Sequence, residues 1–320
     1  MKAAIYDQAG PPEVLRYADV PDPVCSDDGL VIRVTATAIE GGDVINRATQ
    51  EPPHSAYVVG YAAAGEIVEV GRDVHGFTVG QAVTTMGMEG SHAELRSVSA
   101  KTSWLIPEGL DHGAAAAIPI AFGTAHQCLH EAGRLREGET VLVQGGAGGV
   151  GIALIQLAKL AGARVIATVS GQQRTDRLKR LGLDAAIDYR TEDVIDAVRR
   201  MTDEAGVDLV VDPVGGRSLQ VSIGSSKPHG RVVFVGNAGG GELKLDLWPA
   251  MVANLSLTGV FMGTQFERDS VYDNVAGLLA QAAHDHIEVV IDRRFALAEA
   301  AHAHRYIADN PLLGRVLLIP

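Results

Sequence analysis

The stretch VLVQGGAGGVGIALIQLAKLAGARVIATVSG, residues 141–171, carries the pattern that decides the fold. Residues 141–144 form a short apolar run, which is typical of a buried parallel strand. A largely apolar helix should follow the glycines and end at Gly162, and residues 164–169 should form a second strand. A strand, a glycine-rich turn, a helix and another strand in this order predict one unit of a dinucleotide-binding fold.

The glycines of this stretch have the spacing of a dinucleotide fingerprint, and each has its own expected role. Gly146 should allow the tight turn, Gly148 should let the backbone approach a pyrophosphate, and Gly151 should let the helix pack against the strand. Gly149 and Val150 begin the helix, where amides without a partner in the helix point toward an anion. We therefore expect these five residues to hold a pyrophosphate.

The end of the second strand lacks the usual carboxylate. An NAD-binding loop holds a ribose hydroxyl with an acidic residue about 20 residues past the fingerprint, but residues 169–177 read VSGQQRTDR, and the first acid, Asp176, falls on the next helix. Ser170 and Arg174 stand there instead. Because a guanidinium binds a phosphate bidentately and stays charged, we expect NADPH as the coenzyme. The alternative is that Arg174 is a solvated helix residue.

The rest of the chain divides into two textures. Residues 1 to about 110 contain short β-branched segments punctuated by Gly, Asp or Pro, which predict a compact barrel or sandwich. The expected strands there are 29–39, 63–71, 80–86 and 92–100. After a helical stretch at 113–133, strands alternate with helices, which is typical of a parallel sheet with crossover helices. The expected strands of that sheet are 140–144, 164–168, 185–188, 209–212, 231–235 and 255–260.

Composition excludes several classes of protein. The net charge of −12 argues against binding to nucleic-acid phosphates. The chain has only two cysteines, Cys25 and Cys128, too few for a structural zinc held by four thiolates. No apolar run is long enough to cross a bilayer, and the N-terminal residues lack a signal core, so we expect a cytoplasmic protein. The histidine pairs at 284/286 and 302/304 are expected on or beside solvated helix faces.

Several motifs together identify a family resemblance. They are GPPEVLRY (10–17), VLVQGGAGGVG (141–151), GARVIATV (162–169), DAAIDYRTED (184–193), VDLVVDPVGG (207–216) and GRVVFVGNAGG (230–240). With them the chain resembles, over essentially its full length, the zinc-independent quinone oxidoreductases of the medium-chain dehydrogenase/reductase superfamily. The resemblance implies an α/β chain with two domains. A Rossmann-like doubly wound parallel sheet at 119–263 would bind NADPH, and a GroES-like β-barrel catalytic domain would comprise 1–118 and 264–320.

The sequence departs from the zinc-containing members of that superfamily. They carry Gly-His-Glu at the catalytic metal, whereas here Gly60 is followed by Tyr61 and Ala62. The four-cysteine lobe is also missing. His126 and His130 share a helix face that Cys128 does not, which argues against a metal site there. We therefore expect no metal in this protein.

Without a metal to polarise an alcohol oxygen, we expect hydride transfer from NADPH to an acceptor that needs little electrophilic help. Quinones and other α,β-unsaturated carbonyls fit, because conjugation spreads the developing negative charge. One alternative is an enoyl-thioester reductase of a biosynthetic pathway. Another is a catalytically silent NADPH-binding protein.

The resemblance also implies further site residues. Tyr189 would help Arg174 hold the 2′-phosphate, Thr124 would lie near the nicotinamide, and Gly236 and Asn237 would face the coenzyme from a strand end. It further implies a homodimer, with residues 255–263 as the pairing edge strand, although that segment could instead be an internal strand.

Glu40 is the main departure within the family, because many relatives have an asparagine there. A buried carboxylic acid at this place could donate a proton to the substrate if burial raised its pKa. It could equally pair as an ion with Arg47, or cap the backbone. The sequence leaves these three roles open.

Overall fold

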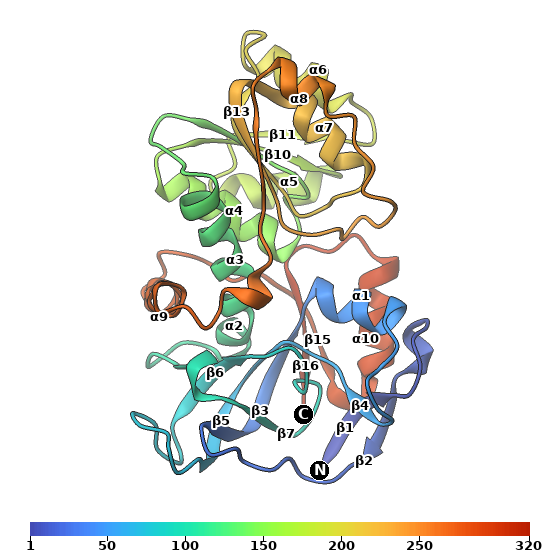
Figure 1. Cartoon of the computed structure of the whole chain (residues 1–320), viewed down its shortest axis with the longest axis vertical. Helices are drawn as coiled ribbons and strands as arrows, with labels where there is room; N and C mark the ends of the chain where they lie inside the picture. Colours follow the sequence, from blue (N-terminus) through green and yellow to red (C-terminus); the bar gives the residue numbers. More distant parts are fainter. The chain divides into compact units, whose positions relative to one another are not determined.

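The computed structural model describes residues 1–320, and the contacts between them divide the chain into two compact units (Figure 1). The first unit comprises Met1–Gly123 and Gly263–Pro320, and the second comprises Thr124–Met262. The domain limits expected from the sequence, 118/119 and 263/264, stay a prediction.

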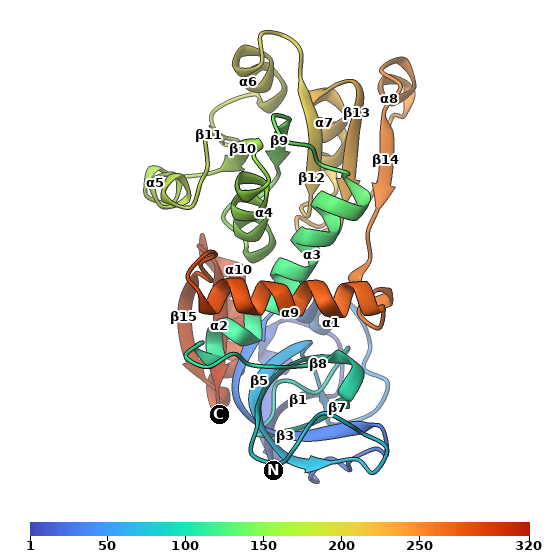
Figure 2. The same cartoon turned by 90° about the vertical axis from the view of Figure 1, so that its left-hand side faces the viewer.

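The second unit is built on a six-stranded sheet in which all neighbours are parallel. Its order is β11-β10-β9-β12-β13-β14, with bounds β9 Thr140–Val143, β10 Arg164–Val169, β11 Ala185–Asp188, β12 Val207–Asp212, β13 Ser226–Phe234 and β14 Ser256–Gly259. The numbering reverses direction at β9, which gives the strand order 3-2-1-4-5-6 of a dinucleotide fold. The predicted doubly wound parallel sheet is confirmed, and Figure 2 shows β14 at its outer edge.

Helices cover this sheet because alternate side chains of each strand point to opposite faces. The helices of this unit are α4 Gly149–Leu160, α5 Gln172–Arg180, α6 Val194–Met201, α7 Arg217–Ser225 and α8 Trp248–Val252, and α3 Gly123–His126 begins at the limit between the units. On one face Leu142, Ile166 and Val210 pack with Val198 of α6 and Leu219 of α7, and all five side chains are buried. This core fixes the carboxyl ends of the strands, from which the loops of the candidate site emerge.

The first unit is β-rich. A seven-stranded, mainly antiparallel sheet has the order β15-β16-β3-β5-β6-β8, with β7 also paired to β3, and a separate sheet has the order β2-β1-β4. The bounds are β1 Lys2–Tyr6, β2 Arg16–Asp19, β3 Gly29–Ile39, β4 Tyr57–Val58, β5 Ala62–Val70, β6 Ala82–Met86, β7 Leu95–Ser99, β8 Ser103–Leu105, β15 Ile291–Ala296 and β16 Arg315–Ile319. The terminal strand β16 pairs with β3, so the C-terminal segment completes the sheet begun near the N-terminus.

The helices of the first unit are short except for α1 Gly41–Thr49, α9 Asp269–Ala283 and α10 Ala300–Asp309. The others are η1 Pro12–Val14, η2 Ala100–Thr102, α2 His112–Ala117, η3 Ile118–Phe122 and η6 Leu297–Glu299, and η5 (Met262–Thr264) crosses the limit between the units. No helix combines the length and the apolarity that a membrane crossing requires.

The helical stretch expected at 113–133 is not uniform. The segments η3 (Ile118–Phe122) and η4 (Gln127–Ala132) are π-helical, with Gly133 N–H donating to Cys128 O five residues back. Pro119 lacks the N–H that a regular α-helical bond would use, which contributes to the first irregularity.

Candidate coenzyme site

The glycine loop between β9 and α4 is shaped by close packing. The left-handed residue of the turn is Gly145, with φ of 65°, so the tight-turn role predicted for Gly146 belongs to its neighbour. Gly146 is required for another reason, because a Cβ there would lie 2.8 Å from Cβ of Ala167 on β10. A Cβ on Gly151 would lie 2.3 Å from Gly145 O, which agrees with the close helix packing expected of that residue.

Gly148 differs from the other two glycines. A Cβ on it would meet only Gly145 O, at 3.6 Å, and its φ of −73° suits any residue. The fold itself therefore does not require glycine here. The absence of a side chain instead leaves open space at the start of α4, which is what a backbone approach to a ligand needs.

The amides that begin α4 complete this cradle. Gly148 is the N-cap, so Gly149, Val150 and Gly151 occupy the first turn, where backbone N–H groups have no acceptor within the helix. The first bond of the helix runs from Ile152 N to Gly148 O. These donors and the positive end of the helix dipole make an anion site.

The end of β10 forms a polar corner. Ser170, which is buried, accepts a hydrogen bond of 2.5 Å from Nη2 of Arg174 and donates to the Tyr189 hydroxyl at 3.3 Å. Arg174, on the first turns of α5, and Tyr189, just after β11, are thus brought together by Ser170. The structure groups the three residues that the sequence assigned to a phosphate.

The carboxylate of Asp188, at the end of β11, accepts hydrogen bonds from the backbone. Its oxygens accept from Gly171 N at 3.3 Å and from Arg190 N at 3.0 Å. The backbone N–H of Arg190 is the largest cause that holds the pKa of Asp188 below its usual value. An ionised Asp188 therefore orients the loop around Gly171 rather than replacing the missing acid of β10.

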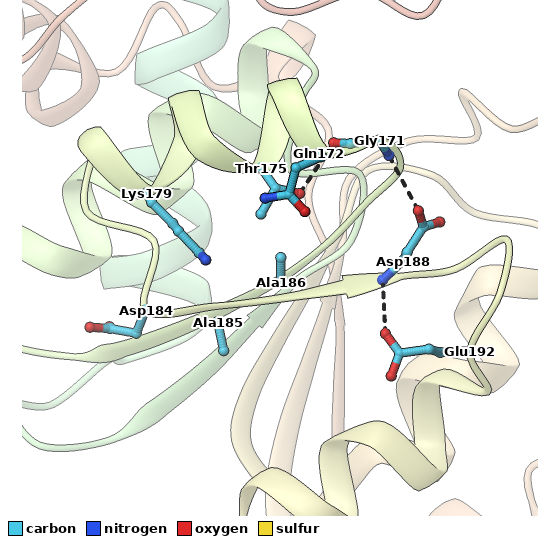
Figure 3. Close-up of a pocket in the computed structure, with 9 residues that line it drawn as sticks. All are labelled: Gly171, Gln172, Thr175, Lys179, Asp184, Ala185, Ala186, Asp188 and Glu192. Carbon is cyan, nitrogen blue, oxygen red and sulfur yellow. Dashed lines mark hydrogen bonds between the residues drawn. The ribbon is translucent and has the colours of Figure 1, made fainter.

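A pocket of about 420 Å³ adjoins this corner between α5 and β11 (Figure 3). It shares Gly171 with the corner and is lined by Gly171, Gln172, Thr175, Lys179, Asp184, Ala185, Ala186, Asp188 and Glu192. Its lining carries one cation and three acids, so it is not itself a phosphate site.

Two further loops emerge from the carboxyl ends of β12 and β13. Gly236 and Asn237 follow β13, and their loop is fastened to the β12 loop by Gly239 N donating to Val214 O at 2.8 Å. Gly215 must be glycine, because a Cβ would lie 2.5 Å from Asn237 Oδ1. That oxygen is buried and has no hydrogen-bond partner in the chain, which leaves an acceptor for a ligand.

Thr124 lies on α3 and is buried, with 5% of its surface exposed. Its contact with a nicotinamide stays a prediction.

Glu40 lies in the first unit, between β3 and α1, and only 2% of it is exposed. Its Oε2 forms an ion pair with Arg315 of β16, while Oε1 has no partner. Burial raises the pKa of Glu40 to about 7, although Arg315 acts in the opposite direction. Pairing with Arg47 is wrong, because that residue lies about two helical turns further along α1 and donates to Gly10 O instead.

Asp43 takes the capping role that was considered for Glu40. Its Oδ2 accepts from Glu40 N at 2.8 Å, and its Oδ1 accepts from Tyr61 N at 3.1 Å. Burial raises the pKa of Asp43 to about 8. The sequence did not single out Asp43 or Arg315, and a polar residue at a helix start was the only signal for the former.

No group of three or more His, Cys, Asp or Glu side chains in the chain could hold a metal ion. His126 and His130 share a face, with ring centroids 4.5 Å apart, while Cys128 is fully buried. Tyr61, at the position where zinc dehydrogenases carry histidine, accepts from Asn46 Nδ2 at 2.6 Å.

Known protein families match segments of both units. A family model described as "Alcohol dehydrogenase GroES-like domain" matches residues 26–108, and one described as "Zinc-binding dehydrogenase" matches residues 149–281. The first match confirms the GroES-like fold expected for the β-rich unit.

Individual relatives match the whole chain. A quinone oxidoreductase of Pseudomonas aeruginosa is 31% identical over 318 residues, covering 97% of each protein. A 2-haloacrylate reductase of a Burkholderia species is 29% identical over 343 residues, covering 99% of this chain and 98% of the relative. A mycobacterial protein solved in complex with NADPH is 30% identical, with a TM-score of 0.94 and all of both chains covered.

Proposed function

Because the chain belongs to the zinc-independent quinone oxidoreductases of the medium-chain dehydrogenase/reductase superfamily, we propose that it uses NADPH to reduce quinones or other α,β-unsaturated carbonyls. The observation that carries this proposal is the corner at the end of β10. There Ser170, Arg174 and Tyr189 meet, and the carboxylate of Asp188 at the end of β11 is committed to backbone amides.

The residues of the second unit fit this coenzyme. The open space at Gly148 and the amides of the first turn of α4 would receive the pyrophosphate. The guanidinium of Arg174 and the hydroxyls of Ser170 and Tyr189 would hold the 2′-phosphate, with charge-assisted hydrogen bonds from the guanidinium. The Asn237 loop would contact the nicotinamide half.

NADPH supplies the hydride when it is bound. The chain's own part is to fix the donor and the acceptor in one geometry and to exclude water, which lowers the entropic cost of the reaction. A conjugated acceptor spreads the incoming charge onto its oxygen, and one proton then completes the reduction. A quinone and an enone both satisfy these demands.

The activity is tested by following NADPH oxidation with a small quinone, a 2-haloacrylate and a crotonyl thioester. Turnover of the quinone or of the haloacrylate supports the proposal. A crotonyl thioester as the only acceptor would establish the alternative, an enoyl-thioester reductase. Tight NADPH binding without turnover of any of the three would identify the silent binding protein.

Glu40 is our candidate for the proton donor, since its pKa of about 7 keeps part of the population protonated near neutrality. The acid form predominates below that pKa, so activity should fall as the pH rises above about 7. Glu40→Gln should lower kcat about 100-fold and remove this decline, as measured by pH–rate profiles of both proteins. The control is Glu66→Gln, at an exposed position of β5. An unchanged pH–rate profile in Glu40→Gln would show that Glu40 is not the proton donor and serves only in its ion pair with Arg315.

We also propose that the protein is a cytoplasmic homodimer. Near the edge strand β14, several large apolar side chains are exposed, among them Trp248 (67%), Met251 (66%) and Val252 (67%). Exposed apolar side chains beside a strand whose outer edge has no partner strand favour association of two copies. Light scattering should give twice the chain mass, and Trp248→Glu should shift it toward the monomer mass. A monomeric wild-type protein would exclude the dimer.

A further inference from the structure

Four buried polar side chains form hydrogen bonds near the glycine loop and the loops that follow β12 and β13. They are Gln144 at the end of β9, Thr168 on β10, Asp212 at the end of β12 and Ser222 on α7, and none is more than 4% exposed. Such groups cost stability unless they are hydrogen-bonded. Their bonds form one connected path that joins strands and a helix distant in sequence.

The path begins at the glycine loop. Gly145, the residue with positive φ, donates its N–H to Thr168 Oγ1 at 2.9 Å, and the Thr168 hydroxyl donates to Gln144 Oε1 at 2.9 Å. The Gln144 amide thus directs its oxygen toward Thr168. Its Nε2 therefore faces Ser222 and donates to Ser222 Oγ at 3.2 Å.

The path ends at a carboxylate. Ser222 Oγ donates to Asp212 Oδ2 at 2.8 Å, and it also lies 3.0 Å from Ser218 O one turn back on α7. The other oxygen, Asp212 Oδ1, accepts from Val214 N at 2.8 Å and from Gly215 N at 2.9 Å. Because the Asn237 loop is fastened to Val214 O, Asp212 holds both the β12 and the β13 loops.

The direction of the bonds makes the path one unit. Thr168 and Ser222 each have a single hydroxyl proton. Each hydroxyl accepts a hydrogen bond from one neighbour and donates to the next, so it orients both neighbours. Loss of the Thr168 hydroxyl would leave both Gly145 N and Gln144 Oε1 without partners. A chain of this kind is stronger than its separate bonds, and breaking it at one place affects the others.

We propose that the Asp212–Ser222–Gln144–Thr168 network is a positioning device that sets the glycine loop and the two neighbouring loops for coenzyme binding. The inference rests on the proposed function. The network touches none of Ser170, Arg174 and Tyr189 through its hydrogen bonds, so it acts on the part that NADPH and NADH share. It governs affinity for both coenzymes and leaves the preference between them unchanged.

The test compares Thr168→Val with Thr168→Ser. Valine has the shape of threonine without its hydroxyl, so the dissociation constants of NADPH and NADH, measured by fluorescence titration, should both rise roughly tenfold to thirtyfold. Serine restores the oxygen and should bring both within about threefold of the wild type. The matched control is Thr84→Val, in the first unit. Thr84 is fully buried and donates to Ala115 O at 2.8 Å, so its loss should lower Tm but leave both dissociation constants unchanged.

A second measurement keeps the proposal testable if Thr168→Val folds poorly. Ser222→Ala breaks the path at its other end and should by itself raise the dissociation constants of both coenzymes. Where Thr168→Val folds, Thr168→Val/Ser222→Ala should bind little more weakly than the weaker single variant, since the two act through Gln144. Three results would contradict the proposal: wild-type affinity in both single variants, additive effects in the double variant, or a loss of affinity for NADPH alone. A wild-type protein that binds neither coenzyme would instead overturn the proposed function, and this inference with it.

Discussion

Gly148→Val is expected to weaken the binding of NADPH and of NADH at least about 100-fold while the protein stays folded. The backbone at residue 148 has φ of −73°, which suits valine, and the nearest atom to a new Cβ is Gly145 O at 3.6 Å. The two methyl groups would fill the space in front of the amides of Gly149–Gly151. A pyrophosphate held there by backbone N–H groups would be displaced, and losing charge-assisted hydrogen bonds of about 1.5–3 kcal/mol each leaves little affinity.

The measurement is a fluorescence titration with each coenzyme, beside a thermal melt of the unliganded protein. Gly148→Ala should give an intermediate loss, because its single methyl group fills less of the space. Gly277→Ala, in the middle of α9, is the matched control, since nothing lies within 4 Å of a Cβ at that glycine. Retained affinity in Gly148→Val, with an unchanged Tm, would show that the pyrophosphate is bound elsewhere.

The sequence predicted the parallel sheet well because its signals are local. All six expected strands between residues 140 and 260 exist, and β11 matches its predicted range of 185–188. Apolar runs bounded by glycine and by charged residues determine such strands within a few residues. Whether 255–263 lies inside the sheet or at its edge depends on the pairing of β14 with β13, which no local pattern contains.

Long-range partners explain what the sequence could not give. The prediction of a solvated helix face is wrong for His304, whose side chain is fully buried with Nε2 3.1 Å from Nε2 of His92. Burial lowers the pKa of both histidines, so both stay neutral inside the unit. Their separation of 212 residues leaves no signal in either segment.

In the candidate site, too, local sequence signals identify some residues, while others depend on partners distant in sequence. The glycine fingerprint and Arg174 stand out because their residue types are tied to phosphate chemistry. Asp212 and Ser222 do not, since a buried acid beneath a loop resembles any strand-end polar residue until its hydrogen bonds are known. The ion pair of Glu40 with Arg315 likewise depends on β16 returning beside β3.

Arg174→Ala is expected to raise the dissociation constant of NADPH about 30- to 100-fold and that of NADH less than about threefold. Only NADPH carries the 2′-phosphate, and a bidentate guanidinium–phosphate contact corresponds to a loss of about 2–3 kcal/mol. The bond from Arg174 Nη2 to Ser170 Oγ places the guanidinium at the end of β10 before any ligand arrives. Arg174→Lys should fall between wild type and alanine, because an ammonium keeps the charge but not the planar pair of donors.

Arg180→Ala is the control for this substitution, since Arg180 is an exposed arginine in the last turn of the same helix α5. It changes the net charge equally and should leave both dissociation constants unaltered. Raising the salt concentration should narrow the difference between wild type and Arg174→Ala, because screening weakens a charge–charge contact in a partly exposed corner. An equal loss of affinity for NADPH and NADH would mean that Arg174 stabilises α5 rather than binding the 2′-phosphate. Another cation would then have to bind that phosphate. A wild-type preference for NADH would contradict the assignment of the corner altogether, since no carboxylate at the end of β10 is present to hold a free ribose hydroxyl.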